Sequence, residues 1–354
     1  MRKSLRFAAV LTVTGLTVGV VAPTEPALAG DQLTITAFGG VIQAAERKAY
    51  FEPFAKQTGI KIIEEEYNGE AAKVRAMVDS KSVTWDVVST DATTALQMCV
   101  EGTIEPIDWK MLGFDRSKFM GADEHECGVP EYFYTYAIAY DKDKLPNGPK
   151  TMADFFDLNK FPGKRGLNKS AFGNVEWALI ADGVPVKDVY KVLSTPEGVD
   201  RAFKKLDTIK KDVVWWQAGA QAPQLLADGQ VVIGKAPTGR IYDANKNAGK
   251  HFEIVWDGQG LGSAVWVIPK GASRRADAYK FLAFAASPQV QADLTRYIPY
   301  GPTNNDGISL VDTTVLPYLP TAPDHMRNAL LVDNTFWAEK GDDLRQRFTA
   351  WLAK

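Results

Sequence analysis

The sequence predicts an α/β fold of two lobes that face each other across a cleft, and three observations support this. The chain has 354 residues, of which 45% are hydrophobic, enough to bury two cores rather than one. Strand-like and helical runs alternate along it, which is typical of mainly parallel sheets. Two longer strand-like runs, near 132–140 and 262–268, mark crossings between lobes. We therefore expect discontinuous lobes, a central mostly parallel sheet in each, hinge strands and an interlobe cleft.

The first lobe is predicted to comprise residues 30–138 and 266–312. A strand over 32–40 ends in a glycine pair, and apolar residues at helical spacing over 41–59 predict a helix that Gly59 ends. A strand over 60–68, a helix over 69–80 and a buried strand over 85–90 continue the alternation. The run at 274–287 predicts a further helix of this lobe.

The second lobe is predicted to comprise residues 139–265 and 313–354. Helical runs lie at 175–183, 196–212 and 222–230, and an apolar strand lies at 231–237. The last helical run, at 335–354, closes the chain. Because ligands of such sheets bind at strand carboxyl ends and in interdomain clefts, we expect the binding site between the lobes.

Residues 1–29 have the pattern of a cleavable signal peptide. A basic start precedes an apolar run over 8–22 that is short for a membrane span, and Ala-Leu-Ala at 27–29 fits cleavage before Gly30. No cysteine directly follows the apolar run, which argues against a lipoprotein anchor. The pattern predicts a protein secreted into the periplasm.

Export affects how the two cysteines are interpreted. Cys99 and Cys127 are the only pair, and an oxidising compartment favours a disulfide between them over two buried thiols. Three scattered histidines show no ligand spacing, so we expect no metal, and we expect no cofactor. The formal charge of −2 gives no reason to expect a nucleic-acid or membrane-surface partner.

Several stretches together resemble one protein family. They are WDVVSTD (85–91), EGTIEPID (101–108), YDKDKLP (140–146), LLADGQVVIGKAPTGR (225–240) and VWVIPKGASRRADAYKFLAFAASPQVQADL (265–294). They resemble the periplasmic solute-binding proteins of ABC importers, in the branch typified by spermidine/putrescine-binding proteins (extracellular solute-binding protein family 1). The resemblance spans nearly the whole chain after the signal peptide. It implies a hinge-closing monomer that captures a small solute and delivers it to a membrane permease.

The polyamine site of that branch is altered in this chain. Polyamine binders use carboxylates and stacked aromatic rings, because a diammonium ligand needs compensating charge in a dry cleft. Where the resemblance implies a tryptophan and an acid, this chain has Gly262 and Ala264, and Ser170 and Gly173 replace two further acids. The loss of these acids argues against a polyamine without excluding one.

Arg240 is the residue that this chain gains at the predicted site. A guanidinium binds a carboxylate, sulfonate or phosphate bidentately, and relatives that bind amino-acid-like solutes such as γ-aminobutyrate carry a similar Gly-Arg turn. We expect Arg240 to hold the anionic group of a small zwitterion; the alternative is a surface or interlobe salt bridge. Those relatives meet the amine with an acid where this chain has Ser263 or Ala264. Asp91 is then the candidate for the amine, or it caps the following helix.

The remaining candidates have both a binding and a structural interpretation. Phe38, Gly39 and Gly40 either present backbone N–H groups to an anion or form a tight turn. The turn at 170–174 offers Ser170, Phe172 and Asn174, Tyr134 and Tyr136 share one side of a crossing strand, and Tyr242 fits either interpretation. Of Trp215 and Trp216, one should face inward and one reach the cleft; we include Trp215 with Ser263 among the candidates.

A periplasmic hydrolase is the remote alternative. Nucleophilic catalysis by serine needs a strained turn and a positioned base, and Gly-X-Ser-X-Gly is absent. Residues 260–265 (GLGSAV) are the nearest approximation. His125, His251 and His325 offer no obvious base. We therefore expect a binding protein and not an enzyme.

Overall fold

The computed structural model describes residues 32–124 and 126–354. The predicted signal peptide, residues 1–29, lies outside these ranges. Within them, no helix is long and apolar enough to cross a membrane.

One sheet runs through the whole molecule, in the order β2-β1-β3-β8-β4-β7-β5-β6, with β9 paired to β4 and β10 paired to β8. Its strands are β1 Gln32–Ala37, β2 Lys61–Glu66, β3 Val87–Asp91, β4 Val129–Asp141, β5 Arg165–Asn168, β6 Val213–Trp216, β7 Ile233–Pro237, β8 Phe252–Val267, β9 Gly301–Pro302 and β10 Leu330–Leu331.

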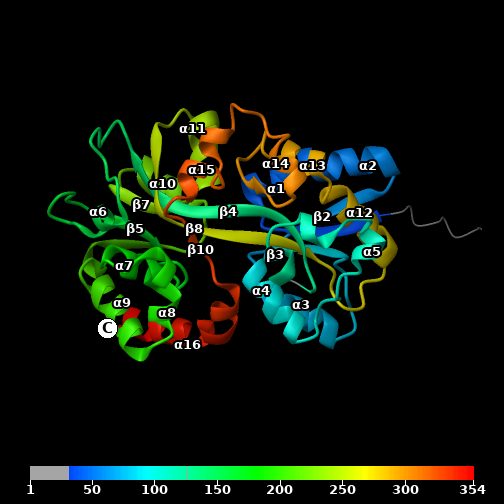
Figure 1. Cartoon of the computed structure of the whole chain (residues 1–354), viewed down its shortest axis with the longest axis horizontal. Helices are drawn as coiled ribbons and strands as arrows, with labels where there is room; N and C mark the ends of the chain where they lie inside the picture. The colour runs from blue at the N-terminus through cyan, green and yellow to red at the C-terminus, as the bar shows by residue number, and fades with distance from the viewer. Residues whose placement is uncertain (1–31, 125) are drawn as a thin grey trace, which may run out of the picture.

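The two ends of the sheet are parallel and its middle is antiparallel. β1 pairs in parallel with β2 and β3, and β5 pairs in parallel with β6 and β7. The long strands β4 and β8 pair with each other and with β3 and β7 in antiparallel fashion. Figure 1 shows β4 and β8 crossing the centre of the molecule from one group of helices to the other. The predicted α/β fold with two crossing strands is confirmed. We call the part around β1–β3 the first half and the part around β5–β7 the second half.

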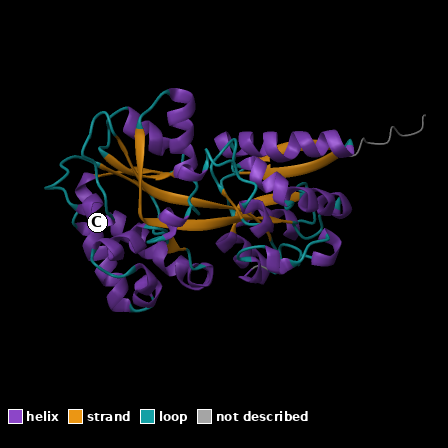
Figure 2. Ribbon diagram, turned by 45° about the horizontal axis from the view of Figure 1, so that its top comes forward, coloured by secondary structure: helices purple, strands orange, loops and turns teal. Residues whose placement is uncertain are grey.

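Helices cover both faces of each half (Figure 2). The first half carries α1 Gly40–Glu46, η1 Arg47–Phe51, α2 Glu52–Thr58, α3 Ala71–Asp79, α4 Ala92–Val100, α5 Trp109–Leu112, η2 Arg116–Lys118, η3 Ala122–Glu124, α12 Arg275–Ala285, α13 Pro288–Leu294 and α14 Asn305–Ile308. The second half carries α6 Met152–Phe156, α7 Asn174–Ala181, η4 Val186–Asp188, α8 Val189–Leu193, α9 Pro196–Asp207, η5 Lys210–Asp212, α10 Gln221–Ala227, α11 Thr238–Ala248 and α16 Asn334–Leu352. Between α14 and α16 lie η6 Leu316–Tyr318 and α15 Pro323–Met326.

Each half has its own hydrophobic core on each face of the sheet. In the first half, one core packs under α1, α12 and α13, and a smaller one packs under α3 and α4. In the second half, α7, α9 and α16 cover one core, and α10 and α11 cover the other. The C-terminal helix α16 buries Phe336, Trp337 and Phe348 in the second half.

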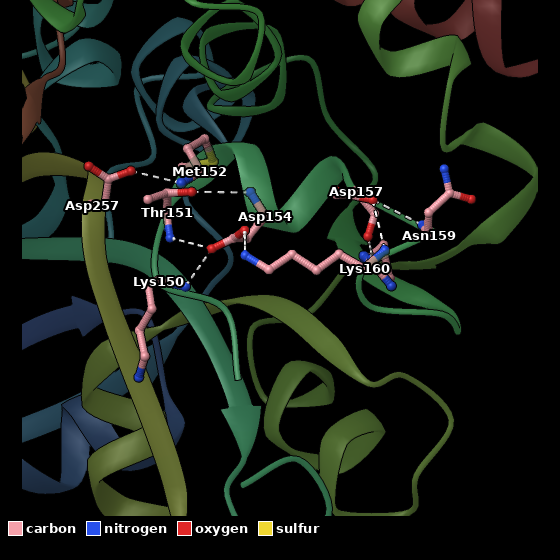
Figure 3. Close-up of polar contacts among 9 residues, drawn as sticks. Lys150, Thr151, Met152, Asp154, Asp157, Asn159, Lys160 and Asp257 are labelled. Atoms are coloured by element: carbon pink, nitrogen blue, oxygen red, sulfur yellow. Dashed lines mark hydrogen bonds and ion pairs between the residues drawn. The ribbon is translucent and has the colours of Figure 1, made fainter. Parts of the chain in front are cut away.

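The crossing strand β8 changes course between Val255 and Gly260, where its pairing with β4 is irregular. Gly258 adopts a left-handed φ of 67°, which glycine tolerates best. Next to it, the Asp257 carboxylate accepts hydrogen bonds from the Met152 backbone (2.7 Å) and from Asn328 Nδ2 (2.6 Å). Figure 3 shows Asp257 reaching the start of α6, whose Thr151–Asp154 capping box lies beside it.

Ala264 and Val265 lie beyond this bend, and they pack in the two cores of the first half. The predicted boundary had assigned them to the second lobe. We propose that the crossing in β8 lies at 255–260, ahead of the predicted residue 266. The other limits of the two lobes remain predictions.

The predicted disulfide is confirmed: Cys99 and Cys127 are bonded, with Cα atoms 5.7 Å apart. The bond joins the end of α4 to the segment that leads into β4. It therefore ties a helix to a crossing strand within the first half.

Candidate functional site

Arg240 lies in the first turn of α11, directly after β7, and is partly buried. Its guanidinium lies against the first half: a methyl group on Gly40 would be 3.1 Å from Nη1. A methyl group on Gly219 would likewise be 3.1 Å from Nε, so the two glycines leave the space that the side chain fills. Among residues 32–124 and 126–354, no protein group forms a hydrogen bond or ion pair with this guanidinium. An unpaired cation thus stands between the two halves.

Asp91 is the last residue of β3 and caps α4. Its carboxylate accepts hydrogen bonds from the Thr94 backbone N–H (2.9 Å) and from Thr94 Oγ1 (2.7 Å). The predicted capping role is therefore confirmed. Each carboxylate oxygen keeps a free lone pair, and no cation in the described part of the chain pairs with it. Asp91 brings a negative charge to the site that the local structure does not neutralise.

Two tyrosines of β4 stand between these charges. The rings of Tyr134 and Tyr136 meet edge to face, 6.0 Å apart. Burial raises the pKa of Tyr136; the negative charge of Asp91 raises it further and the positive charge of Arg240 lowers it. Both charges therefore act on the Tyr136 hydroxyl. The charge of Arg240 also lowers the pKa of Tyr300, which burial raises overall.

Tyr134 and Tyr300 occupy space left by glycines. A methyl group on Gly262 would lie 2.8 Å from Cζ of Tyr134, and one on Gly239 would lie 2.7 Å from Cε1 of Tyr300. The Tyr134 ring therefore covers Gly262, the position where the polyamine-binding branch is expected to carry a tryptophan. Tyr300 had no signal in the sequence that set it apart from other aromatic residues.

The side chains of the turn at 168–174 are oriented differently from the prediction. Asn174 is fully buried: its Nδ2 donates to the Asn168 and Ser170 carbonyls at 2.8 Å, and its Oδ1 accepts from Lys235. The expectation that Asn174 faces the cleft is wrong, because its side-chain polar atoms bond inside the turn and to the buried Lys235. Phe172 packs its ring on Trp337, and Ser170 accepts a hydrogen bond from the Phe172 N–H.

Ser170 nevertheless lines an open hollow of about 730 Å³ at the carboxyl ends of β5 and β6. Tyr136, Asn168 and Trp216 line it too, and the end of α16 closes its far side. The hollow therefore begins at the tyrosine that lies between the two charges.

Trp216, and not the candidate Trp215, is the tryptophan of β6 that contacts the tyrosines of the site. Trp215 packs edge-on against Phe348 and Trp351 of α16. Trp216 stacks on Tyr136, with ring centres 6.3 Å apart. Choosing Trp215 for the site was wrong, because residues of a strand alternate between faces and the C-terminal helix covers the Trp215 face.

Three other candidates have mainly structural neighbours. Tyr242 packs edge to face on Tyr318. Ser263 pairs with Phe133, so it lies on the opposite face of β8 from Gly262, which Tyr134 covers. Phe38 stacks on Tyr67 with ring centres 5.6 Å apart.

The turn at the start of α1 is only partly suited to an anion. The Gly39 N–H donates to Gln43 Oε1, and a methyl group on Gly39 would lie 2.6 Å from the Glu66 carboxylate. Negative charge therefore already lies at Gly39. The exposed Gly40, beneath Arg240, is the part of this turn that an anion can approach.

Two pairs of fully buried ionisable residues flank the site, and only one of the four residues stands out in the sequence. Glu46 and Glu131 meet in the first half, where Ser89 Oγ donates to Glu131 at 2.7 Å. Burial raises the pKa of Glu46 to about 8 and that of Glu131 well above its usual value. Glu176 and Lys235 meet in the second half; Lys235, alone in the apolar run VVIGKAP, was the one visible clue.

Known proteins are similar to most of this chain. The family model described as bacterial extracellular solute-binding protein matches residues 49–314. A γ-aminobutyric acid-binding protein of Pseudomonas aeruginosa is 46% identical over 324 residues, 92% of either chain. A spermidine/putrescine-binding periplasmic protein of Escherichia coli K12 is 25% identical, over 72% of this chain and 73% of that one.

Solved structures of the same kind superimpose on nearly the whole chain. The binding protein AgtB of Agrobacterium tumefaciens R10, in complex with agropinic acid, has a TM-score of 0.81 and 35% identity over 92% of this chain and 99% of that one. The Atu4243 GABA receptor has a TM-score of 0.81 and 34% identity over 92% of this chain and 98% of that one.

Proposed function

We propose that this chain, which belongs to the family of bacterial extracellular solute-binding proteins, captures a small zwitterion of the γ-aminobutyrate type. The observation that carries the proposal is the unpaired guanidinium of Arg240 between the two halves of the molecule. A cation without a partner in a partly buried site is costly unless a ligand supplies the missing charge.

The charges of the site match the two ends of such a solute. The carboxylate of the solute would be held by Arg240 beside Gly40, in a bidentate pair. The ammonium would be held by Asp91, with the Tyr134 and Tyr136 rings lining the space between. The γ-aminobutyric acid-binding relative and the GABA receptor structure support this ligand class.

A polyamine is the second candidate, favoured by the spermidine/putrescine-binding relatives. The charges here oppose it. Asp91 is one acid where a dication needs at least two, and the guanidinium of Arg240 would repel the other ammonium. We therefore propose a zwitterion as the ligand in preference to a polyamine.

Solute capture would close the hinge formed by β4 and β8. Contacts from Asp91 and Gly40 on the first half and Arg240 on the second half stabilise a closed state that the free protein samples. We propose that the monomeric protein works in the periplasm, after removal of residues 1–29. There it would present the closed form to an ABC permease and release its solute chemically unchanged.

Isothermal titration calorimetry with γ-aminobutyrate, putrescine and butyrate tests the proposal. The first two are matched four-carbon chains with an ammonium, and they differ in whether the other end is a carboxylate or a second ammonium. We expect γ-aminobutyrate to bind and putrescine to fail, with butyrate weaker because it leaves Asp91 unpaired. Putrescine binding without γ-aminobutyrate binding would reverse the proposed ligand class. Chromatography of the solute after incubation checks that it is unchanged.

A further inference from the structure

A buried lysine lies directly behind the tyrosines of the candidate site. Lys235 of β7 is 1% exposed, and its Nζ donates to the Phe172 carbonyl (3.0 Å) and to Asn174 Oδ1 (3.2 Å). The same ammonium lies 5.2 Å from the ring centre of Tyr136. Tyr136 is thus in contact with Lys235 and with Trp216, and its ring is held between the cleft and the interior of the second half.

The space for this ammonium is made by Gly173. A methyl group on Gly173 would lie 2.2 Å from Nζ of Lys235, and its left-handed φ of 75° is itself suited to glycine. The lysine therefore organises the 168–174 turn through two acceptors while it contacts the tyrosine. One residue connects two parts of the candidate site.

Glu176 of α7 is the counter-charge, and it is anchored away from the cleft. Its Oε1 accepts hydrogen bonds from Trp337 Nε1 (2.8 Å) and Tyr190 Oη (3.2 Å), while Oε2 has no partner in the described residues. Glu176 and Lys235 both line a small enclosed cavity whose other walls include Tyr134 and Tyr136. The positive end of this pair is thus the end that touches Tyr136.

We propose that Lys235 is a positioning and specificity-determining residue of the cleft: it fixes Tyr136 and adds a buried positive charge behind it that favours solutes with a carboxylate. This inference rests on the proposed function, because it needs a solute with a carboxylate. Arg240 contacts the solute in this arrangement, and Lys235 acts through Tyr136.

The proposal predicts a pH dependence with a definite sign. Burial lowers the pKa of Lys235 to about 7, while the Glu176 charge opposes that shift. The ionisable groups around it are Glu176 on α7, Tyr190 on α8, and Tyr134 and Tyr136 on β4; Asp91 and Arg240 lie beyond the tyrosines. As pH rises through 7, Lys235 loses its positive charge, so the Lys235–Glu176 pair becomes more negative. Affinity for a carboxylate should therefore fall.

Calorimetric titration of γ-aminobutyrate from pH 6 to pH 8.5 provides the test, because both charges of this solute are constant over that range. For the wild type we expect the dissociation constant to rise about fivefold across the range. Lys235→Met should bind more weakly at pH 6 and show no rise. Glu176→Gln should move the rise to lower pH, because it removes the charge that supports the lysine ammonium.

Two further variants control for other causes. Lys48→Met removes an exposed lysine of the first half and should leave the wild-type curve unchanged. Glu46→Gln removes a second group that titrates near this range, and it should leave the rise in place. Thermal melts at each pH confirm that every variant is folded.

A wild-type affinity that is constant from pH 6 to 8.5, or a rise that persists in Lys235→Met, overturns the inference and leaves the proposed function standing. If γ-aminobutyrate fails to bind the wild type at every pH, the proposed function itself is overturned.

Discussion

The two halves of the molecule have similar strand pairing but opposite charges at the cleft. The first half contributes Asp91 and the backbone at Gly40, while the second contributes Arg240. The buried ionisable residues also differ between the halves: the first half has two acids, Glu46 and Glu131, whose pKa values burial raises, and the second has Lys235 with Glu176. The difference in charge at the cleft matches the two ends of the dipolar solute that we propose, with its ammonium at the first half and its carboxylate at the second.

The largest effect should come from the cation of the second half. Arg240→Ala should raise the dissociation constant for γ-aminobutyrate at least about 30-fold, because truncating one partner of a buried charge pair costs about 2–5 kcal/mol. Calorimetry measures this. The matched control is Arg201→Ala, which removes an exposed arginine paired with Asp182 on the surface of the second half. Unchanged affinity in Arg240→Ala would assign the arginine to the interlobe surface instead.

The two halves are also stabilised internally in different ways: a disulfide closes a segment of the first half, and α16 packs on the core of the second. Replacing Cys99 and Cys127 by serine should lower the free energy of unfolding by about 2–4 kcal/mol, because a 28-residue separation is no longer closed in the unfolded chain. Urea unfolding measures the loss, and the affinity for γ-aminobutyrate should stay the same. An unaltered urea midpoint would show that the disulfide does not stabilise this half.

The acid pair of the first half predicts that stability depends on pH. Folding raises the pKa of Glu46 from 4.5 to about 8. The contribution of Glu46 to the free energy of unfolding is therefore fully present below pH 4.5 and is lost as pH rises through 8. Glu46→Gln should therefore gain stability relative to wild type as pH rises from 5 to 8.5, by about 4 kcal/mol. Parallel urea titrations measure this difference, and a constant difference across that range is the contrary result.

The smallest expected effect is a difference in affinity between variants of the two adjacent tryptophans of β6. Trp216→Leu should weaken γ-aminobutyrate binding about threefold, because an aromatic pair with Tyr136 contributes about 0.5–1.5 kcal/mol. Trp215→Leu should destabilise the packing on α16 and leave the affinity unchanged. Equal affinities of the two variants would mean that the stacking on Tyr136 does not reach the solute.

The sequence predicted the features that follow from local pattern. The alternation of strands and helices and the two crossing strands follow from periodicity. The disulfide follows from the presence of a single cysteine pair. The cap at Asp91 depends only on residues three positions apart. The predicted helix over 41–59 is present as the continuous run α1, η1 and α2, which Gly59 ends with a φ of 78°.

The errors concern which face a side chain takes. Trp215 packs on α16, more than 100 residues later in the chain, whereas Trp216 stacks on Tyr136 of β4. Asn174 turned inward because Lys235 offered it a partner. The buried acids Glu46 and Glu131 lie in a helix and a strand whose patterns look ordinary. Their pairing depends on a fold that brings residues 85 positions apart into contact, which no local pattern records.

The most direct test of the account is a crystal structure of the protein with γ-aminobutyrate. We predict the solute carboxylate within hydrogen-bonding distance, about 2.7–3.2 Å, of the Arg240 guanidinium, and the ammonium at a similar distance from Asp91. A solute bound with its carboxylate away from Arg240, or outside the space between the two halves, would contradict the account.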